Sequence, residues 1–397
     1  MCSTWSRKHK RTRPPGQSSF TASSARLRVH PICASLLPAL SPGSLTLPKL
    51  LLGNSLREQV DRSPWLQRLL WACEAALVRI LLFACRLFSP DRASAAGRRL
   101  MRWLGPRLEK TGWLARNIKV AFPEKSPAEA DALLRDIWGN IGSVVAEYAH
   151  LETICGREAE ERLEIVTRGD IEAFKGTGKP AIFVAGHLAN WEVTPTGSLL
   201  MGAPVKVVYS PLQHPWIDRM MRRKRERLGG DLVNLQDGIR AMVRHLRSGS
   251  SIGLLVDQRS DRGEPVPFFG QDMLTTTIPA RLALRYGCEL VPVRAERLEG
   301  ARFRVTFYEP IEPDPAIEEE SQQVLAMTTK INALFEAWIR ERPHEWFCSK
   351  RKWPKESWKG IRHPREEARA AGADRTADPQ TLSASSRTSQ SVTVRSS

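Results

Sequence analysis

The sequence predicts an α/β fold in which a mostly parallel sheet is flanked by helices. From residue 163 onward, short apolar runs alternate with segments of helical periodicity, which is the pattern of βα units. The chain has 397 residues, enough to bury a substantial core. One apolar run, 181–185, ends at Gly186 and His187. Reactive side chains in open α/β folds gather at such strand ends, so His187 is the first candidate for a functional residue.

Residues 1–60 are expected to form a disordered basic extension. Glu58 is the first acidic residue, and the region before it is rich in Arg, Lys, Ser and Pro. This composition is typical of a transit peptide or an unfolded segment, and we favour the unfolded segment. A secretory signal is not expected, because Pro38 and Pro42 interrupt the leucine runs. Residues 359–397 are polar and rich in Ser, Arg and Thr, and are expected to be a disordered tail.

Residues 61–110 are expected to form a helical region that associates with a membrane. The stretch 65–88 is long enough to cross a bilayer, which takes about 20 residues. Four charged residues interrupt it: Arg68, Glu74, Arg79 and Arg86. At about 100° per residue the three arginines fall within about 20° of one another. An arginine stripe beside a broad apolar face is typical of a helix lying at a membrane interface. The alternative is an amphipathic helix packed on the folded domain.

Residues 111–358 are expected to form the main folded domain. Ser126 to Glu129 is a capping box with a proline at the first helical position, and its helix should run to about residue 151. Strands are predicted at 163–166, 181–185, 205–209, 231–234, 251–256, 289–296 and 302–308. Helices are predicted near 194–201, 215–228, 237–247, 278–286 and 321–341. The last two strands are expected to form a hairpin around Gly300.

His187 and Glu192 form the pattern H-x4-E. Pro195 suits the first turn of a helix, so the pair spans the turn before that helix. We expect the Glu192 carboxylate to hold one ring nitrogen of His187, which leaves the other nitrogen free to accept a proton from a substrate hydroxyl. In the alternative interpretation His187 caps the helix and Glu192 is a surface residue.

Composition favours anionic partners. The formal net charge is +17 and the pI is about 10.0. The densest basic cluster is 219–227, which suits docking of an acidic protein or binding of a phosphate or oxyanion. The seven cysteines are scattered and form no C-x-x-C pair, so neither a metal site nor a disulfide framework is expected. No organic cofactor is expected either.

Several blocks resemble the bacterial lipid A biosynthesis acyltransferases, over about residues 65–353. They are GHLANWE with His187 and Glu192, the segment 209–230 with Arg225 and Arg227, and the segment 254–277 with Asp257. The resemblance implies a glycerolipid acyltransferase-like fold and transfer of an acyl chain from an acyl carrier protein thioester to a hydroxyl of a lipid A precursor. It implies catalysis by His187 and Glu192, with Arg225 and Asp257 contacting the acceptor or the oxyanion. The alternative for Asp257, as a lone residue, is a turn or helix cap. Lys224 stands where the family often has glycine.

The family resemblance also implies a place at the cytoplasmic face of the bacterial inner membrane, anchored around residues 65–88. The aromatic and basic segment 344–355 is expected at the same interface. The apolar turn 266–270 is expected either to line an acyl-chain channel or to plug its loop onto the core. A lysophospholipid or glycolipid O-acyltransferase is the nearest alternative function. A basic membrane-surface or nucleic-acid-binding protein is the second, although no nucleic-acid-binding motif is present.

Overall fold

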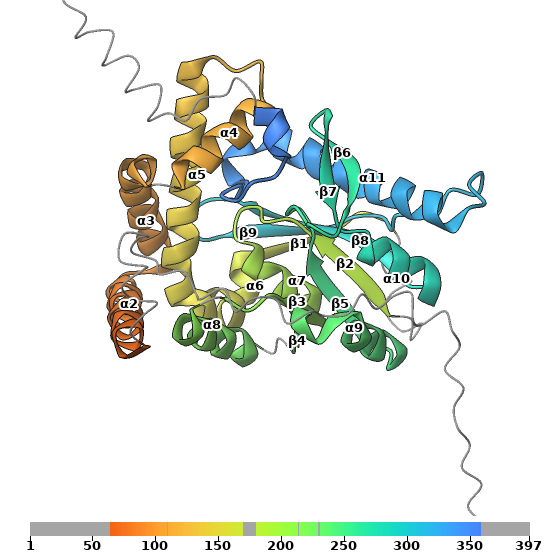
Figure 1. Cartoon of the computed structure of the whole chain (residues 1–397). Coiled ribbons are helices and arrows are strands. Elements are labelled where there is room, and N and C mark those ends of the chain that lie inside the picture. The colour runs from red at the N-terminus through yellow and green to blue at the C-terminus, as the bar shows by residue number, and fades with distance from the viewer. Residues whose placement is uncertain (1–63, 109, 170–179, 213, 229–230, 359–397) are drawn as a thin grey trace, which may run out of the picture. The chain divides into compact units, whose positions relative to one another are not determined.

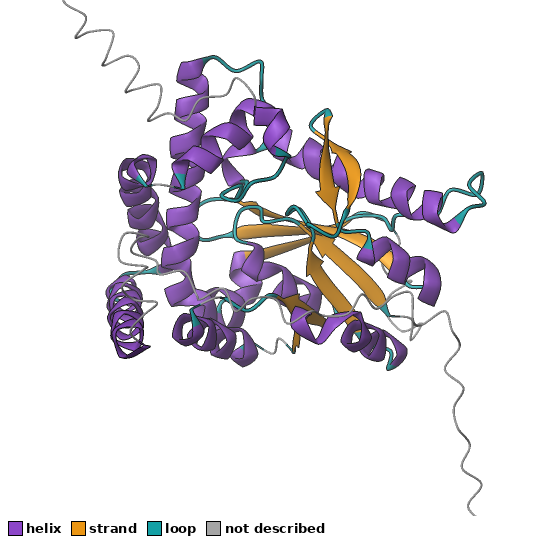
Figure 2. Cartoon of the chain, viewed as in Figure 1, coloured by secondary structure: helices purple, strands orange, loops and turns teal. Residues whose placement is uncertain are grey.

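The computed structural model describes residues 64–108, 110–169, 180–212, 214–228 and 231–358. The expected disordered extension and tail lie outside the described residues. The fold is α/β, with a mostly parallel sheet flanked by helices (Figures 1 and 2). The helices are α2 (Pro64–Arg86), α3 (Pro90–Leu104), α4 (Thr111–Ala121), α5 (Pro127–Glu147), α6 (Ala159–Arg162), α7 (Thr194–Leu200), α8 (Pro215–Arg227), α9 (Gly238–Arg247), α10 (Ile278–Tyr286) and α11 (Glu320–Glu341). The strands are β1 (Leu163–Thr167), β2 (Ala181–Ala185), β3 (Val205–Tyr209), β4 (Leu232–Asn234), β5 (Ser251–Leu255), β6 (Glu264–Phe268), β7 (Gln271–Thr275), β8 (Glu289–Arg297) and β9 (Phe303–Phe307).

The main sheet has seven strands in the order β1-β9-β8-β2-β5-β3-β4. Neighbouring strands are parallel except β8 and β9, which form the hairpin expected around Gly300. All seven predicted strands are present. The order places β2 at the centre, so the strand end that carries His187 has neighbours on both sides.

Strand β2 separates two cores. All five of its residues are buried, as a continuous apolar run in a parallel sheet requires. Ile182 and Val184 face one core with α4, α5, α10 and α11. Ala181, Phe183 and Ala185 face the other, with β1 and β9. This alternation follows from the two-residue repeat of a strand, and it holds the following loop between two packed layers.

A second sheet, the hairpin β6–β7, was not predicted. Its first strand contains two prolines, which argue against a strand in sequence and are tolerated here because the strand lies at a sheet edge. Phe269 and Gly270 form the two-residue turn, and both have positive φ angles (53° and 70°). Phe268 and Phe269 are buried in the main core. Of the two roles expected for 266–270, the structure supports the plug on the core.

The segment after α11 also packs in this core. Trp346 stacks on Phe269, and Trp353 stacks on Phe268. Both tryptophans are completely buried. The prediction that the aromatic side chains of 344–355 lie at a membrane interface is therefore wrong for these two residues. The sequence pattern was misleading because basic residues alternate with tryptophans whose rings point inward.

The capping box that begins α5 is confirmed, with Ser126 and Glu129 bonded reciprocally. Helix α3 lies against α5, which runs beside the sheet (Figure 1). A Cβ atom added to Gly142 on α5 would lie 2.1 Å from the Gly97 carbonyl oxygen on α3, so only glycine allows this approach. Helix α3 therefore packs closely on α5.

Helix α2 buries one side and exposes the other. Ala75 and Leu82 are buried, while large apolar side chains are exposed on the outer face: Trp65, Leu69, Leu77, Ile80 and Phe83. Within the described part of the chain, no helix is both long and apolar enough to cross a membrane. The structure therefore gives no support for a membrane-spanning helix at residues 65–88. The physical reason is the four charged residues in α2.

Candidate active site

The register of two parallel strands brings His187 and Asp257 together. Strand β2 pairs with β5 so that Ala185 lies opposite Leu255. His187 and Asp257 each follow two residues later, at the same edge of the sheet. Nδ1 of His187 lies 2.5 Å from Oδ1 of Asp257. The His187 side chain is 16% exposed and that of Asp257 is 1% exposed, so the carboxylate lies beneath the ring.

Asp257 is held ionised by a buried cation. The Lys352 ammonium lies 3.2 Å from its second carboxylate oxygen and 2.5 Å from its backbone carbonyl. Burial alone would raise the pKa of Asp257, but Lys352 and His187 outweigh burial and hold it well below the usual range. An ionised carboxylate only accepts hydrogen bonds. The proton between the two residues therefore sits on Nδ1. Nε2 of His187, which lies 3.3 Å from the side-chain amide nitrogen of Gln258, is left as the acceptor nitrogen and the candidate base.

The loop that carries His187 is fixed by the segment after α11. The Phe347 amide donates to the His187 carbonyl at 2.9 Å, and the Ala189 amide donates to the Glu345 carbonyl at 3.0 Å. Ala189 adopts a positive φ of 48°, so the loop turns sharply after the histidine. The Trp191 ring packs edge-on against the His187 ring, with centroids 5.0 Å apart. These contacts leave His187 little freedom to rotate away from Asp257.

Glu192 does not hold His187 as the H-x4-E pattern suggested. Its buried carboxylate accepts hydrogen bonds from three side chains: Nε of Arg225 at 2.7 Å, Nε1 of Trp191 at 3.2 Å, and the Tyr148 hydroxyl. Asp257, and not Glu192, holds the His187 ring, and its other partner is Lys352. The reason is positional: Glu192 lies in the short helix that follows the loop, and its side chain points toward α5 and α8.

The Glu192 cluster ties α8 to the loop after β2. Burial alone would raise the pKa of Glu192, but Arg225 outweighs it and lowers that pKa. The same pairing raises the pKa of Arg225 against the effect of burial. Burial and the neighbouring Glu192 carboxylate raise the pKa of Tyr148 well above its ordinary value. The three groups thus form a neutral phenol and an ion pair. This arrangement fixes α8 against the loop after β2, and it leaves no free proton acceptor.

The sequence singled out His187, Glu192, Arg225 and Asp257, and the structure sorts them into two pairs. Three further participants were missed: Tyr148, Lys352 and Gln258. Tyr148 fell within the helix predicted to run to about residue 151, and Lys352 within the aromatic and basic segment 344–355 expected at a membrane. The detectable signal for Lys352 was weak, because burial of one lysine in a Lys-Arg-Lys run is not visible in sequence. No group of three or more His, Cys, Asp or Glu side chains in the described ranges is arranged to hold a metal ion.

Comparison with known proteins decides the family. The family model for bacterial lipid A biosynthesis acyltransferases matches residues 65–355. The chain belongs to this family. It is therefore assigned to the acyltransferases of glycolipid biosynthesis.

Individual relatives are distant. A lipid A biosynthesis acyltransferase of Haemophilus influenzae is 24% identical over 173 residues, which cover 42% of this chain and 54% of that protein. A phosphatidylinositol mannoside acyltransferase of Mycolicibacterium smegmatis is 24% identical over 58% of this chain and 75% of that protein. The lipid A biosynthesis myristoyltransferase of Escherichia coli K12 is 24% identical over 58% of this chain and 71% of that protein. The relatives thus include enzymes named for two different glycolipids.

Proposed function

We propose that this acyltransferase moves a fatty acyl chain from an acyl carrier protein thioester to a hydroxyl of a lipid A precursor, forming an acyloxyacyl group. The observation that carries the proposal is the His187–Asp257 pair at the ends of two adjacent parallel strands. It supplies a base of defined tautomer, which transfer to a hydroxyl requires.

In the proposed mechanism, Nε2 of His187 takes the proton of the acceptor hydroxyl as its oxygen attacks the thioester carbonyl. The Asp257 carboxylate stabilises the imidazolium that forms. The tetrahedral intermediate then expels the thiolate, and His187 returns the proton to it. One ester bond forms, one thioester bond breaks, and a free thiol leaves. The chemistry needs no cofactor.

Asp257 and Glu192 act as positioning residues in this scheme. Asp257 is covered by His187 and Lys352, so it orients the base and does not contact the acceptor directly. Glu192 acts through Arg225, whose guanidinium remains partly exposed at the cluster. Arg225 keeps its proposed role as a contact for the acceptor or the oxyanion, because guanidinium geometry suits both.

The donor and acceptor are proposed from charge and from the relatives. The net charge of +17 favours an acidic donor such as acyl carrier protein. Names of relatives point to lipid A and, alternatively, to phosphatidylinositol mannosides, so another glycolipid acceptor is the second candidate. Family membership favours either one over the nucleic-acid-binding interpretation.

The proposed location is the cytoplasmic face of the bacterial inner membrane. The exposed apolar side chains of α2 favour a helix that lies in the membrane interface.

A matrix of donors and acceptors tests the proposal. Purified full-length protein is given acyl carrier protein or coenzyme A thioesters, each with a tetra-acylated lipid A precursor, a phosphatidylinositol mannoside or a lysophospholipid. We expect transfer from the carrier protein to the lipid A precursor. Transfer to another acceptor alone would replace the proposed substrate, and transfer only from coenzyme A would replace the proposed donor.

A further inference from the structure

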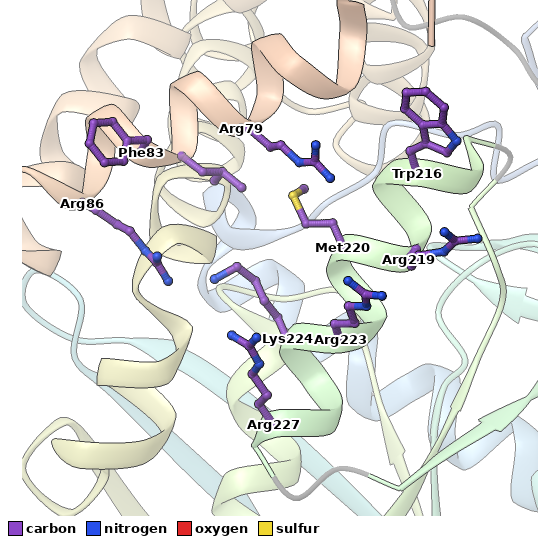
Figure 3. Close-up of a pocket in the computed structure, with 10 residues that line it drawn as sticks. Arg79, Phe83, Arg86, Trp216, Arg219, Met220, Arg223, Lys224 and Arg227 are labelled. Atoms are coloured by element: carbon purple, nitrogen blue, oxygen red, sulfur yellow. The ribbon is translucent and has the colours of Figure 1, made fainter. Parts of the chain in front are cut away.

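A basic cleft lies between α2 and α8 (Figure 3), and neither His187 nor Asp257 is among its lining residues. Its cavity volume is about 660 Å³, in the range of small-molecule sites. None of its ten lining residues is acidic. Six are cationic: Arg79, Arg86, Arg219, Arg223, Lys224 and Arg227. Leu82, Phe83, Trp216 and Met220 complete the lining.

The cations of the cleft are poorly compensated. Glu152 pairs with Arg227 at 3.1 Å and approaches Arg86 at 3.9 Å. The Lys224 ammonium is buried and has no hydrogen-bond partner among the described residues. Burial and the nearby Arg86 lower the pKa of Lys224, and the opposing effect of the Glu152 carboxylate does not outweigh them. A buried ammonium without a partner costs stability, so this arrangement is one that an anion would complete.

The cleft is held open by contacts at both ends. His214, which precedes α8, lies with Nε2 3.4 Å from a carboxylate oxygen of the buried Glu74 on α2. At the other end, Nε of Arg86 donates to the Ala149 carbonyl at 3.1 Å. The first contact ties the start of α8 to α2. At the other end of the cleft, Arg86 of α2 lies opposite Lys224 and Arg227 of α8 (Figure 3).

Apolar surface adjoins the charge. Phe83 and Trp216 line the cleft and are substantially exposed, and Phe83 belongs to the exposed apolar face of α2. A ligand that fits both features has an anionic headgroup and apolar chains. Clustered guanidinium groups suit phosphate because their N–H fork matches its oxygens in pairs.

Helix α8 connects the cleft to the catalytic region. Lys224 lines the cleft, while the adjacent Arg225 turns toward Glu192. A headgroup bound in the cleft would therefore contact the same helix that carries Arg225.

We propose that the cleft binds the phosphate-bearing headgroup of the glycolipid acceptor. This assignment rests on the proposed function and names where the acceptor's phosphate is held. The binding step itself requires no acyl transfer, so it can be tested separately.

The first test compares two variants of equal charge. Arg219→Gln/Arg223→Gln removes two cations from the cleft, and Arg222→Gln/Arg240→Gln removes two exposed cations outside it. Binding of the full chain is measured on phosphatidylcholine vesicles that contain a tetra-acylated lipid A precursor, either phosphorylated or enzymatically dephosphorylated. We expect the cleft variant to lose at least about tenfold in affinity for the phosphorylated lipid, with the control within about threefold of wild type.

Lys224→Met separates binding from folding. Because the Lys224 ammonium is buried without a partner among the described residues, removing its charge should leave the Tm of the lipid-free protein unchanged or raise it. Affinity for the phosphorylated lipid should nevertheless fall about tenfold. A fall in Tm with unchanged affinity would assign Lys224 a structural role and overturn its part in binding.

Three results would overturn the proposal. Equal losses in the cleft and control variants would mean general attraction to a charged surface. A raised KM for the acyl carrier protein thioester, with no change for the acceptor, would make the cleft a donor dock. Inorganic phosphate that competes as well as the lipid would indicate an ion site without a lipid role. Cleft-dependent binding by a protein that transfers no acyl chain would refute the proposed function and leave the cleft assignment standing.

Discussion

Replacing Asp257 by asparagine tests whether Asp257 orients the base. The change puts a neutral amide in place of the carboxylate, and this amide can donate to Nδ1 of His187, which favours the tautomer with its proton on Nε2. That tautomer has no acceptor nitrogen facing the substrate. We expect Asp257→Asn to lower the single-turnover rate of acyl transfer by roughly 10³–10⁴-fold, the scale of losing the correct tautomer in a catalytic triad.

The same change also affects folding. Lys352 is 1% exposed, and its ammonium would lose the carboxylate that now lies 3.2 Å away. An uncompensated buried charge costs about 3–5 kcal/mol. Thermal or denaturant unfolding should therefore show a large loss in Asp257→Asn.

A double variant separates these two effects. Asp257→Asn/Lys352→Met removes the stranded ammonium, so it should recover much of the lost stability. Its transfer rate should stay low, because His187 still lacks its carboxylate. Near-wild-type transfer by folded Asp257→Asn, or recovery of transfer together with stability in the double variant, would refute the assignment of Asp257.

The remaining predictions concern the Glu192 cluster, acid stability and helix packing. Glu192→Gln removes the carboxylate that pairs with Arg225, and it should lower the free energy of unfolding by about 3–5 kcal/mol. The pH profile of its residual acyl transfer should keep the wild-type shape. A displaced profile would show that Glu192 acts directly on His187. Burial, and then the neighbouring Arg342, lower the pKa of His344 to about 4. The contribution of neutral His344 to stability is therefore complete above about pH 6.5 and is lost as the pH falls toward 4. His344→Gln should flatten that loss in unfolding curves, and an unchanged slope would contradict it. Gly142→Ala should cost roughly 1–3 kcal/mol because its Cβ meets backbone on α3, whereas Gly156→Ala, which meets nothing within 4 Å, should be near neutral.

Local patterns were sufficient for most of the fold. Apolar runs and capping signals located the seven strands of the main sheet and the helices between them. The hairpin β6–β7 was missed because Pro265 and Pro267 conceal a strand at an edge. Trp346 and Trp353 were placed at a membrane because burial depends on partners, here Phe268 and Phe269, that lie far away in sequence.

The sequence named four residues of the candidate site. It missed Tyr148, Lys352 and Gln258, and it did not give the observed pairs. His187 was singled out as a residue beyond a strand end, and Asp257 through the family resemblance. Their pairing depends on β2 lying next to β5 in matched register, which is a property of strand order. H-x4-E suggested that Glu192 pairs with His187, because the two are close in sequence. The Glu192 carboxylate instead pairs with Arg225, which is distant in sequence.

The most direct test of the central claim is acyl transfer by His187→Ala. Wild-type and variant protein would be compared in single turnovers with a labelled acyl carrier protein thioester and a lipid A precursor, at matched folded concentrations. We predict transfer by the wild type and its collapse in His187→Ala, since Nε2 is the proposed base. Undiminished transfer in a folded His187→Ala variant would contradict the account.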